Sequence, residues 1–197
     1  MKCIAQPIWL LMLLNLFAGL PIGCTAQPGA APDETEPTPT RTDYELFELV
    51  ALDLLDSDEF PGRKPRSTIV VGDQTRGATS GCGDVGRKDR LIPAEICTAL
   101  KKRNWENPIS LRNFKPSNPK VLVTDVRTAE GIIEFEGAFP DARCYVEAWL
   151  PGNSDDGMTA VLTAEIGPSM HGASATWMLV NNDGLWKVKW REVSRFQ

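Results

Sequence analysis

The chain contains a single histidine, His171, and only five cysteines among its 197 residues. No two cysteines have the CxxC spacing, and neither HExxH nor GxSxG occurs. The sequence therefore does not support a zinc site, a thioredoxin-like redox pair or serine-hydrolase chemistry. We predict no cofactor and no metal. A lone histidine between two predicted strands, in GPSMHGAS, is typical of a turn or surface residue.

Clustered positive charge is also scarce, since the net charge is -5 at pH 7. A compact basic cluster is formed by Lys101, Lys102 and Arg103. It falls where a helix is predicted to end, a position at which cations offset the helix dipole. Proteins bind phosphate backbones through clustered Lys and Arg side chains, so we expect no binding to nucleic acid.

Apolar runs are short, and the longest, residues 8–20, lies near the start of the chain, after the single charge at Lys2. This run, IWLLMLLNLFAGL, has the length of a secretory signal and is too short to span a membrane. No later stretch is apolar enough to cross one. We predict that residues 1–24 are a signal peptide and that the protein is extracytoplasmic.

Cys24, in LPIGCTAQ, follows a small residue at the end of the apolar run and so resembles the acylated cysteine of bacterial lipoprotein precursors. This resemblance implies a lipid on Cys24 and the membrane as a partner. The alternative is cleavage near Ala26, which would give a secreted or periplasmic protein. Residues 25–42 are rich in Pro, Thr and acid, and we predict a disordered tether.

We predict that residues 43–197 form a single α+β domain, in which two helices pack on one face of a mostly antiparallel β-sheet ending in a four-stranded meander. Helical periodicity covers residues 43–55, with Thr42 and Glu45 at capping-box spacing, and a second helix ends near Asn104. The candidate strands are residues 67–71, 121–126, 131–135, 143–150, 158–166, 172–181 and 185–193.

The last predicted strand alternates tryptophan and valine with basic residues. Trp186, Val188 and Trp190 are expected to face inward, with Lys187, Lys189 and Arg191 in water. The segments NSDDG and NNDG precede predicted strands, and Asp-Gly favours the left-handed backbone of tight hairpins. Calcium ligation by NSDDG is the alternative, although the loop is too short for an EF-hand.

Outside the signal, the cysteines are Cys24, Cys82, Cys97 and Cys144. If Cys24 carries lipid, only one intramolecular disulfide can form in an oxidising compartment. We favour Cys82 with Cys97, which would close a glycine-rich loop onto the second helix. Cys144 lies in a strand pattern and is predicted to be a buried small hydrophobe.

Other patterns give weak signals for chemistry. Gly81, Gly83 and Gly86 spell GxGxxG, but the motif does not run from a strand directly into a helix, so a flexible loop is favoured over a dinucleotide site. Glu134 and Glu136 share one face of a predicted strand, where they are solvated glutamates or a pair of glycosidase type. The tryptophans belong to the core or line a sugar or apolar pocket.

The order of motifs YELFELVALDLL, TIVVGDQTRG, LIPAEICTALKKRN and a closing hairpin with DG and GLW resembles a group of uncharacterised secreted or lipid-anchored bacterial proteins. This resemblance covers about 150 residues and implies a fold and a location but no activity. The last hairpin, GLWKVKWREV, is also similar to the C-terminal strands of the nuclear transport factor 2-like cone fold. That fold hosts both enzymes and binding modules.

We predict an extracytoplasmic, lipid-anchored accessory or binding domain without a recognisable catalytic motif, whose protein or small-molecule partner is unknown. The alternative is a cone-fold small-molecule binder or enzyme that uses the concave face of the sheet. Its candidate pocket residues are His171, Glu134, Trp149 and Trp177.

Overall fold

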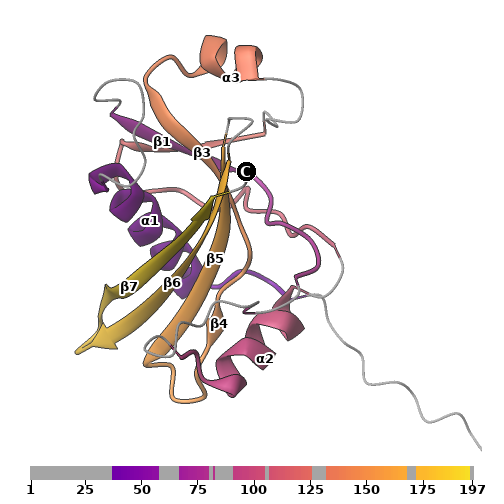
Figure 1. Cartoon of the computed structure of the whole chain (residues 1–197), viewed down its shortest axis with the longest axis vertical. Helices are drawn as coiled ribbons and strands as arrows, with labels where there is room; N and C mark the ends of the chain where they lie inside the picture. Colours follow the sequence, from indigo (N-terminus) through magenta and orange to yellow (C-terminus); the bar gives the residue numbers. More distant parts are fainter. Residues whose placement is uncertain are drawn as a thin grey trace, which may run out of the picture. The chain divides into compact units, whose positions relative to one another are not determined.

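The computed structural model describes residues 37–57, 67–79, 82, 91–104, 107–125, 132–167 and 172–195. The elements are α1 (Arg41–Asp56), β1 (Thr68–Gly72), α2 (Ala94–Arg103), β2 (Val121–Thr124), α3 (Ile132–Ala138), β3 (Ala142–Ala148), β4 (Gly152–Asn153), β5 (Thr159–Gly167), β6 (Ala173–Asn182) and β7 (Leu185–Arg195). Figure 1 shows α1, α2 and α3 arranged around one sheet.

The seven strands form one mixed sheet in the order β2-β1-β3-β5-β6-β7, with the short β4 paired to β5. β1 is parallel to both of its neighbours, β2 and β3, whereas every other pair is antiparallel. The predicted α+β class with a mostly antiparallel sheet is confirmed. The four predicted C-terminal strands correspond to β3, β5, β6 and β7, which lie side by side, each antiparallel to the next.

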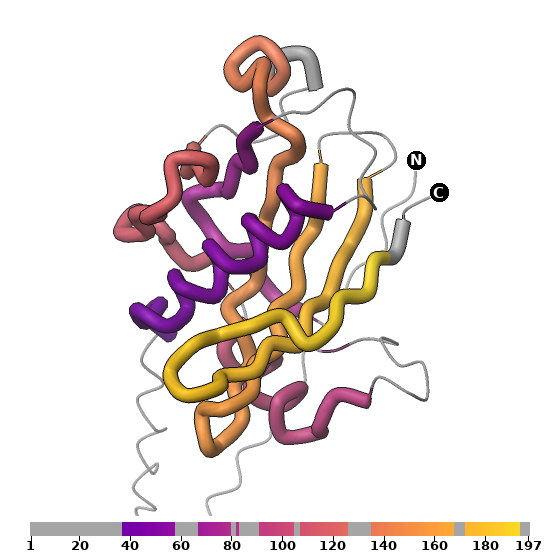
Figure 2. Tube along the Cα trace, turned by 90° about the vertical axis from the view of Figure 1, so that its left-hand side faces the viewer, coloured from indigo at the N-terminus to yellow at the C-terminus, as the bar shows by residue number. Residues whose placement is uncertain are grey.

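The helices cover both faces of the sheet, not one as the sequence suggested. α1 packs on the first face, where Ile69 and Val71 of β1 join Leu46 and Leu54 in the main core. Val70 points the opposite way and packs with Phe135 of α3. α2 lies on that second face as well, because its Ile96 and Leu100 pack against β5 and β6. Figure 2 shows α1 crossing in front of the strands.

α1 begins two residues earlier than predicted. Thr40 is its N-cap and Asp43 occupies the third helical position, which together make a capping box. The Asp43 Oδ2 atom accepts hydrogen bonds from the Thr40 backbone N–H at 2.6 Å and from the Thr40 hydroxyl at 2.9 Å. The expected box of Thr42 and Glu45 has the same spacing, but the box forms two residues earlier, with Asp43, which is fully buried.

The strand predicted over residues 131–135 is wrong, because residues 132–138 form helix α3. Phe135 is fully buried, and Phe139, four residues later, packs against it with ring centroids 5.3 Å apart. Contact between positions i and i+4 is a helical relationship. A window of five residues was too short to separate that spacing from strand alternation. Glu134 and Glu136 therefore do not share a strand face.

The inward tryptophan face predicted for the last strand is interrupted by a β-bulge. The pairing with β6 shifts register between Met178 and Leu179, so that Trp190 faces Met178 while Val188 faces Leu179. An extra residue in one strand reverses the direction of the side chains that follow it. Trp186 and Val188 consequently pack on the α1 side, and Trp190 packs on the α2 side.

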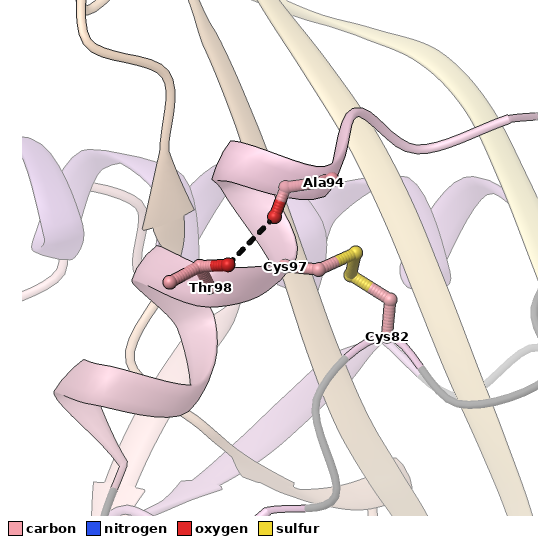
Figure 3. The surroundings of a disulfide bond; sticks show 4 residues. All are labelled: Cys82, Ala94, Cys97 and Thr98. Atoms are coloured by element: carbon pink, nitrogen blue, oxygen red, sulfur yellow. Dashed lines mark hydrogen bonds between the residues drawn. A yellow bond between two sulfur atoms is a disulfide. The ribbon is translucent and has the colours of Figure 1, made fainter.

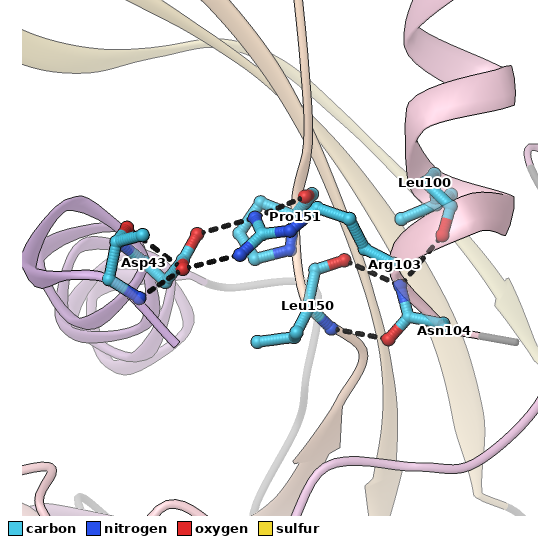
Figure 4. Close-up of polar contacts among 7 residues, drawn as sticks. Asp43, Leu100, Arg103, Asn104, Leu150 and Pro151 are labelled. Atoms are coloured by element: carbon cyan, nitrogen blue, oxygen red, sulfur yellow. Dashed lines mark hydrogen bonds and ion pairs between the residues drawn. The ribbon is translucent and has the colours of Figure 1, made fainter. Parts of the chain in front are cut away.

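Asn104, which follows α2, fixes this helix to the chain between β3 and β4. Its side-chain amide donates to the carbonyl of Leu150 at 2.8 Å, and its side-chain oxygen accepts from the Leu150 N–H at 2.8 Å (Figure 4). The same amide also donates to the Leu100 carbonyl. Asn104, which is 2% exposed, thus satisfies backbone groups of its own helix and of a residue 46 positions further along the chain.

Candidate functional site

A recess of about 270 Å³ opens at the carboxyl ends of the parallel strands β1 and β3. Ligands often bind at this edge of a sheet, since the chain leaves parallel strands there in loops that can carry side chains. The recess is lined by Asp73, Gln74, Thr75, Arg76, Gly77, Ala78, Pro108, Tyr145, Glu147 and Trp149. Most of these side chains are polar or aromatic, which makes the recess a candidate binding site.

The segment after β1 is held in place by backbone hydrogen bonds. The N–H groups of Thr75 and Arg76 donate to the carbonyls of Ile109 and Ala148, each at 2.9 Å. β1 ends at Gly72, where an added Cβ would lie 2.7 Å from the hydroxyl oxygen of Tyr145. The glycine therefore makes room for the tyrosine that forms one wall of the recess.

Arg76 lies at the centre of the polar groups. Its Nη1 atom lies 2.7 Å from Glu147 Oε2 and 3.0 Å from Glu165 Oε2. The Arg76 side chain is 39% exposed, and the two glutamate side chains are 25% and 33% exposed. One guanidinium nitrogen thus bridges two carboxylates, while a large part of the arginine side chain still faces solvent.

The two glutamates are direct partners across the β3–β5 ladder. Like charges directly opposite each other on one sheet face are unfavourable, so Arg76 compensates a repulsion that the strands alone would leave. Sequence reasoning missed this group, because its three members come from a loop and two strands. The available signal was an acid within each of two otherwise apolar strands, YVEAW and TAEIG.

Two aromatic side chains support this charged group. The ring centroid of Trp149 lies 5.7 Å from Arg76 Cζ, a cation–π distance, and its Nε1 donates to the Gly77 carbonyl at 3.0 Å. The Tyr145 hydroxyl donates to Glu147 Oε1 at 3.3 Å. These contacts restrict the orientations of the guanidinium and of Glu147, which favours preorganised recognition.

Polar side chains continue from the recess across the same face of the sheet. The backbone N–H of Trp149 donates to the Thr163 carbonyl. Thr163 lies opposite Thr176 on the neighbouring strand, and Thr176 lies opposite Glu192. Thr176 is only 3% exposed. Thr163 Oγ1 and Glu192 Oε2 are buried without a hydrogen-bond partner among the described residues. The face between α2 and α3 is therefore polar in its middle, unlike the apolar face beneath α1.

The structure does not bring the predicted pocket residues together. Trp149 lines the recess, whereas Trp177 is fully buried on the α1 face, where its Nε1 donates to Asp53 Oδ2 at 2.8 Å. Glu134 belongs to α3, so it is not on a sheet face. His171 and Cys24 lie outside the described residues, as do Gly81, Gly83 and Gly86.

Cys82 and Cys97 are joined by a disulfide, and they are the pair favoured from the sequence (Figure 3). Cys97 is in α2, and Cys82 packs with Ile96 and Leu100 on the face of the sheet that α2 covers. Cys144 is a free thiol, 5% exposed. Burial raises its pKa to about 12, which makes it a poor nucleophile at neutral pH.

The segments NSDDG and NNDG both form hairpin turns. Asp183 and Gly184 have φ values of 55° and 84°, the left-handed backbone that the segment NNDG predicted between β6 and β7. Gly157, at the end of NSDDG, has φ 68° between β4 and β5. Among the described residues, no three metal-ligating side chains of the His, Cys, Asp or Glu types come together.

Within the part of the chain that the structure describes, no helix has both the length and the hydropathy needed to cross a membrane. Comparison with known proteins finds no family model, no curated protein and no solved structure that matches the chain.

Proposed function

We propose that this protein is an extracytoplasmic binding domain, anchored by a lipid on Cys24, and that the recess around Arg76 is its ligand site. The observation that carries the proposal is Arg76, whose guanidinium is held by two glutamates and an aromatic ring while its side chain remains 39% exposed. An ion pair that only stabilises the fold does not need an exposed donor edge.

The hydrogen-bonding capacity of Arg76 supports this role. A guanidinium has five N–H donors in a planar fork. Both carboxylate contacts use Nη1, and Nε and Nη2 make no hydrogen bond or ion pair with the other described residues. The unused Nε–Nη2 edge is the one that binds an acceptor group in a bidentate manner. The fold therefore positions the arginine by one nitrogen and leaves its other donors available.

The anchor is supported by sequence alone. Cys24 follows a short apolar run with the length of a signal, and a Pro- and Thr-rich segment, residues 25–39, separates it from the N-cap of α1. A tether of this composition keeps a domain clear of a membrane surface. A recess on the tethered domain would then meet ligands outside the cytoplasm.

Expression of the full chain in a bacterial host tests the anchor, with wild type compared to Cys24→Ser. We expect the wild type in the membrane fraction with an added diacylglyceryl mass, and the variant to lose both. A soluble wild type that starts near Gln27 and carries no lipid would overturn the anchor and leave the ligand site to be judged separately.

A thermal-shift screen of small polar metabolites tests the recess. A compound that stabilises the wild type should fail to stabilise Arg76→Ala and should still stabilise Arg41→Ala. Arg41 is the matched control, because its ion pair with Glu45 is exposed and lies on α1. Equal stabilisation of both variants by every hit would place the ligand elsewhere.

A further inference from the structure

We infer that the recess takes a saccharide, through adjacent hydroxyl groups that bridge the free edge of Arg76 and the carboxylate of Glu165. This inference rests on the proposed function, because it requires the recess to be the ligand site. It goes further by naming the chemical class that the recess recognises.

The charges of the recess argue against a simple ion. Asp73 and Glu147 line the recess and Glu165 contacts Arg76, so three carboxylates accompany a single guanidinium. Among the described residues, a second cation, Arg112, lies 3.8 Å from Asp73 and is largely exposed. An anionic ligand at Arg76 would face these carboxylates. A cationic ligand would have to displace Arg76 from contacts of 2.7 and 3.0 Å. A neutral ligand avoids both costs.

The unused hydrogen-bonding groups are of both kinds. Arg76 offers donors at Nε and Nη2. Glu165 adjoins the recess beside its cross-strand partner Glu147, and it offers its second oxygen, since only Oε2 contacts the arginine. A hydroxyl group is both a donor and an acceptor. Two neighbouring hydroxyls can therefore donate one hydrogen bond to the carboxylate and accept one from the guanidinium. Hydrogen bonds to charged groups are the stronger ones, which gives such a pair direction and specificity.

Size and surroundings agree with a ligand of one or two sugar rings. The volume of about 270 Å³ lies just below the usual range for pockets that hold drug-sized molecules. Tyr145 and Trp149 add aromatic surface beside the polar groups. Aromatic surface next to convergent charged groups suits a molecule that has apolar C–H faces and polar edges.

Saturation-transfer NMR on the full chain tests the inference, in micelles of a detergent without a sugar head group. The probes are glucose, galactose, mannose, N-acetylglucosamine and the disaccharides of these units, with glutamine, spermidine and inorganic phosphate as a zwitterion, a cation and an anion. We expect at least one sugar to bind with a millimolar or lower dissociation constant. Arg76→Ala and Glu165→Gln should each weaken it about tenfold or more, and Arg41→Ala should leave it unchanged.

A ligand-side variant keeps the test independent of protein folding. Deoxy analogues of the bound sugar, offered to the wild type, should lose about tenfold in affinity when a bridging hydroxyl is removed. The inference is overturned if no sugar of the panel binds the wild type, or if a sugar binds equally to Arg76→Ala. Binding of glutamine, spermidine or phosphate alone, lost in Arg76→Ala, would keep the recess as the ligand site and refute the saccharide.

Discussion

Asp43 of α1 and Arg103 of α2 form a two-armed buried ion pair. Nη1 of the arginine lies 2.8 Å from Oδ1, and Nη2 lies 2.7 Å from Oδ2 (Figure 4). The Asp43 side chain is 0% exposed, and that of Arg103 is 19% exposed. Nη1 also donates to the Pro151 carbonyl at 2.8 Å. One arginine therefore connects two helices, which cover opposite faces of the sheet, with the chain leading into β4.

Asp43→Ala should lower the free energy of unfolding by about 3 kcal/mol, because it leaves the Arg103 charge buried without its partner and removes half of the capping box. Urea unfolding followed by tryptophan fluorescence measures the change. Glu45→Ala is the control, since it removes an exposed ion pair with Arg41 and should cost less than about 1 kcal/mol. Similar losses in the two variants would contradict a special role for the buried pair.

Removing the disulfide should destabilise the domain. Cys82 and Cys97 are 15 residues apart, and closing a loop of this length stabilises a fold by about 3 kcal/mol through the unfolded state. The double variant Cys82→Ser, Cys97→Ser should unfold at lower urea concentration than the oxidised wild type. Reduction with dithiothreitol should shift the wild type to the same midpoint and leave the double variant unmoved. A wild type insensitive to reduction would argue against the bond.

Two glycines should respond in opposite ways to alanine. At Gly152 a Cβ would lie 2.5 Å from the Ile96 carbonyl oxygen and 2.7 Å from the Leu100 nitrogen, both backbone atoms of α2, so the helix must move. We expect Gly152→Ala to cost about 2 kcal/mol. Gly137, in α3, has nothing within 4 Å of its Cβ position, and Gly137→Ala should gain about 0.5 kcal/mol. Thermal unfolding of both variants measures these changes in stability. Equal effects of the two substitutions would contradict the close contact between β4 and α2.

Cys144 should make the domain less stable at alkaline pH. Its folded pKa is raised by burial from 9.0 to about 12, so between these values the unfolded chain releases a proton that the folded chain keeps. The free energy of unfolding should therefore fall by about 1.4 kcal/mol per pH unit in that window and be unaffected below it. Urea unfolding of wild type and Cys144→Ala at pH 8, 9 and 10 isolates this effect from other titrating groups. Parallel losses in both proteins would refute it.

The parts of the fold that were predictable are those set by local pattern. α1 follows from its apolar spacing, and the turn at Asp183 and Gly184 follows from residues that tolerate positive φ. α3 and the bulge near Met178 were not predictable in this way, because packing of Phe135 on β1 and β3 decides the first and cross-strand register decides the second. The placement of α1 and α2 on opposite faces likewise depends on chain path and not on periodicity.

The recess was less accessible to sequence reasoning than the fold. Arg76, Glu147 and Glu165 are separated by up to 89 positions in the chain, and each alone resembles an ordinary surface residue. Only the parallel pairing of β1 with β3 and the antiparallel pairing of β3 with β5 place them together. Trp149 was a predicted pocket residue and does line the recess, but the sequence did not indicate the partners that surround it there.

The position of β1 between β2 and β3 affects how the chain folds. β1 pairs with β2 on one side and with β3 on the other. Its residue Ile69 lies opposite both Val121 and Cys144, which are distant from it in the sequence. β5, β6 and β7 need only short turns to pair with one another. Distant pairings form more slowly than adjacent ones. In a pulse-labelling hydrogen-exchange experiment, amides of β6 should gain protection before those of β1 and of β2, which joins the sheet only through β1.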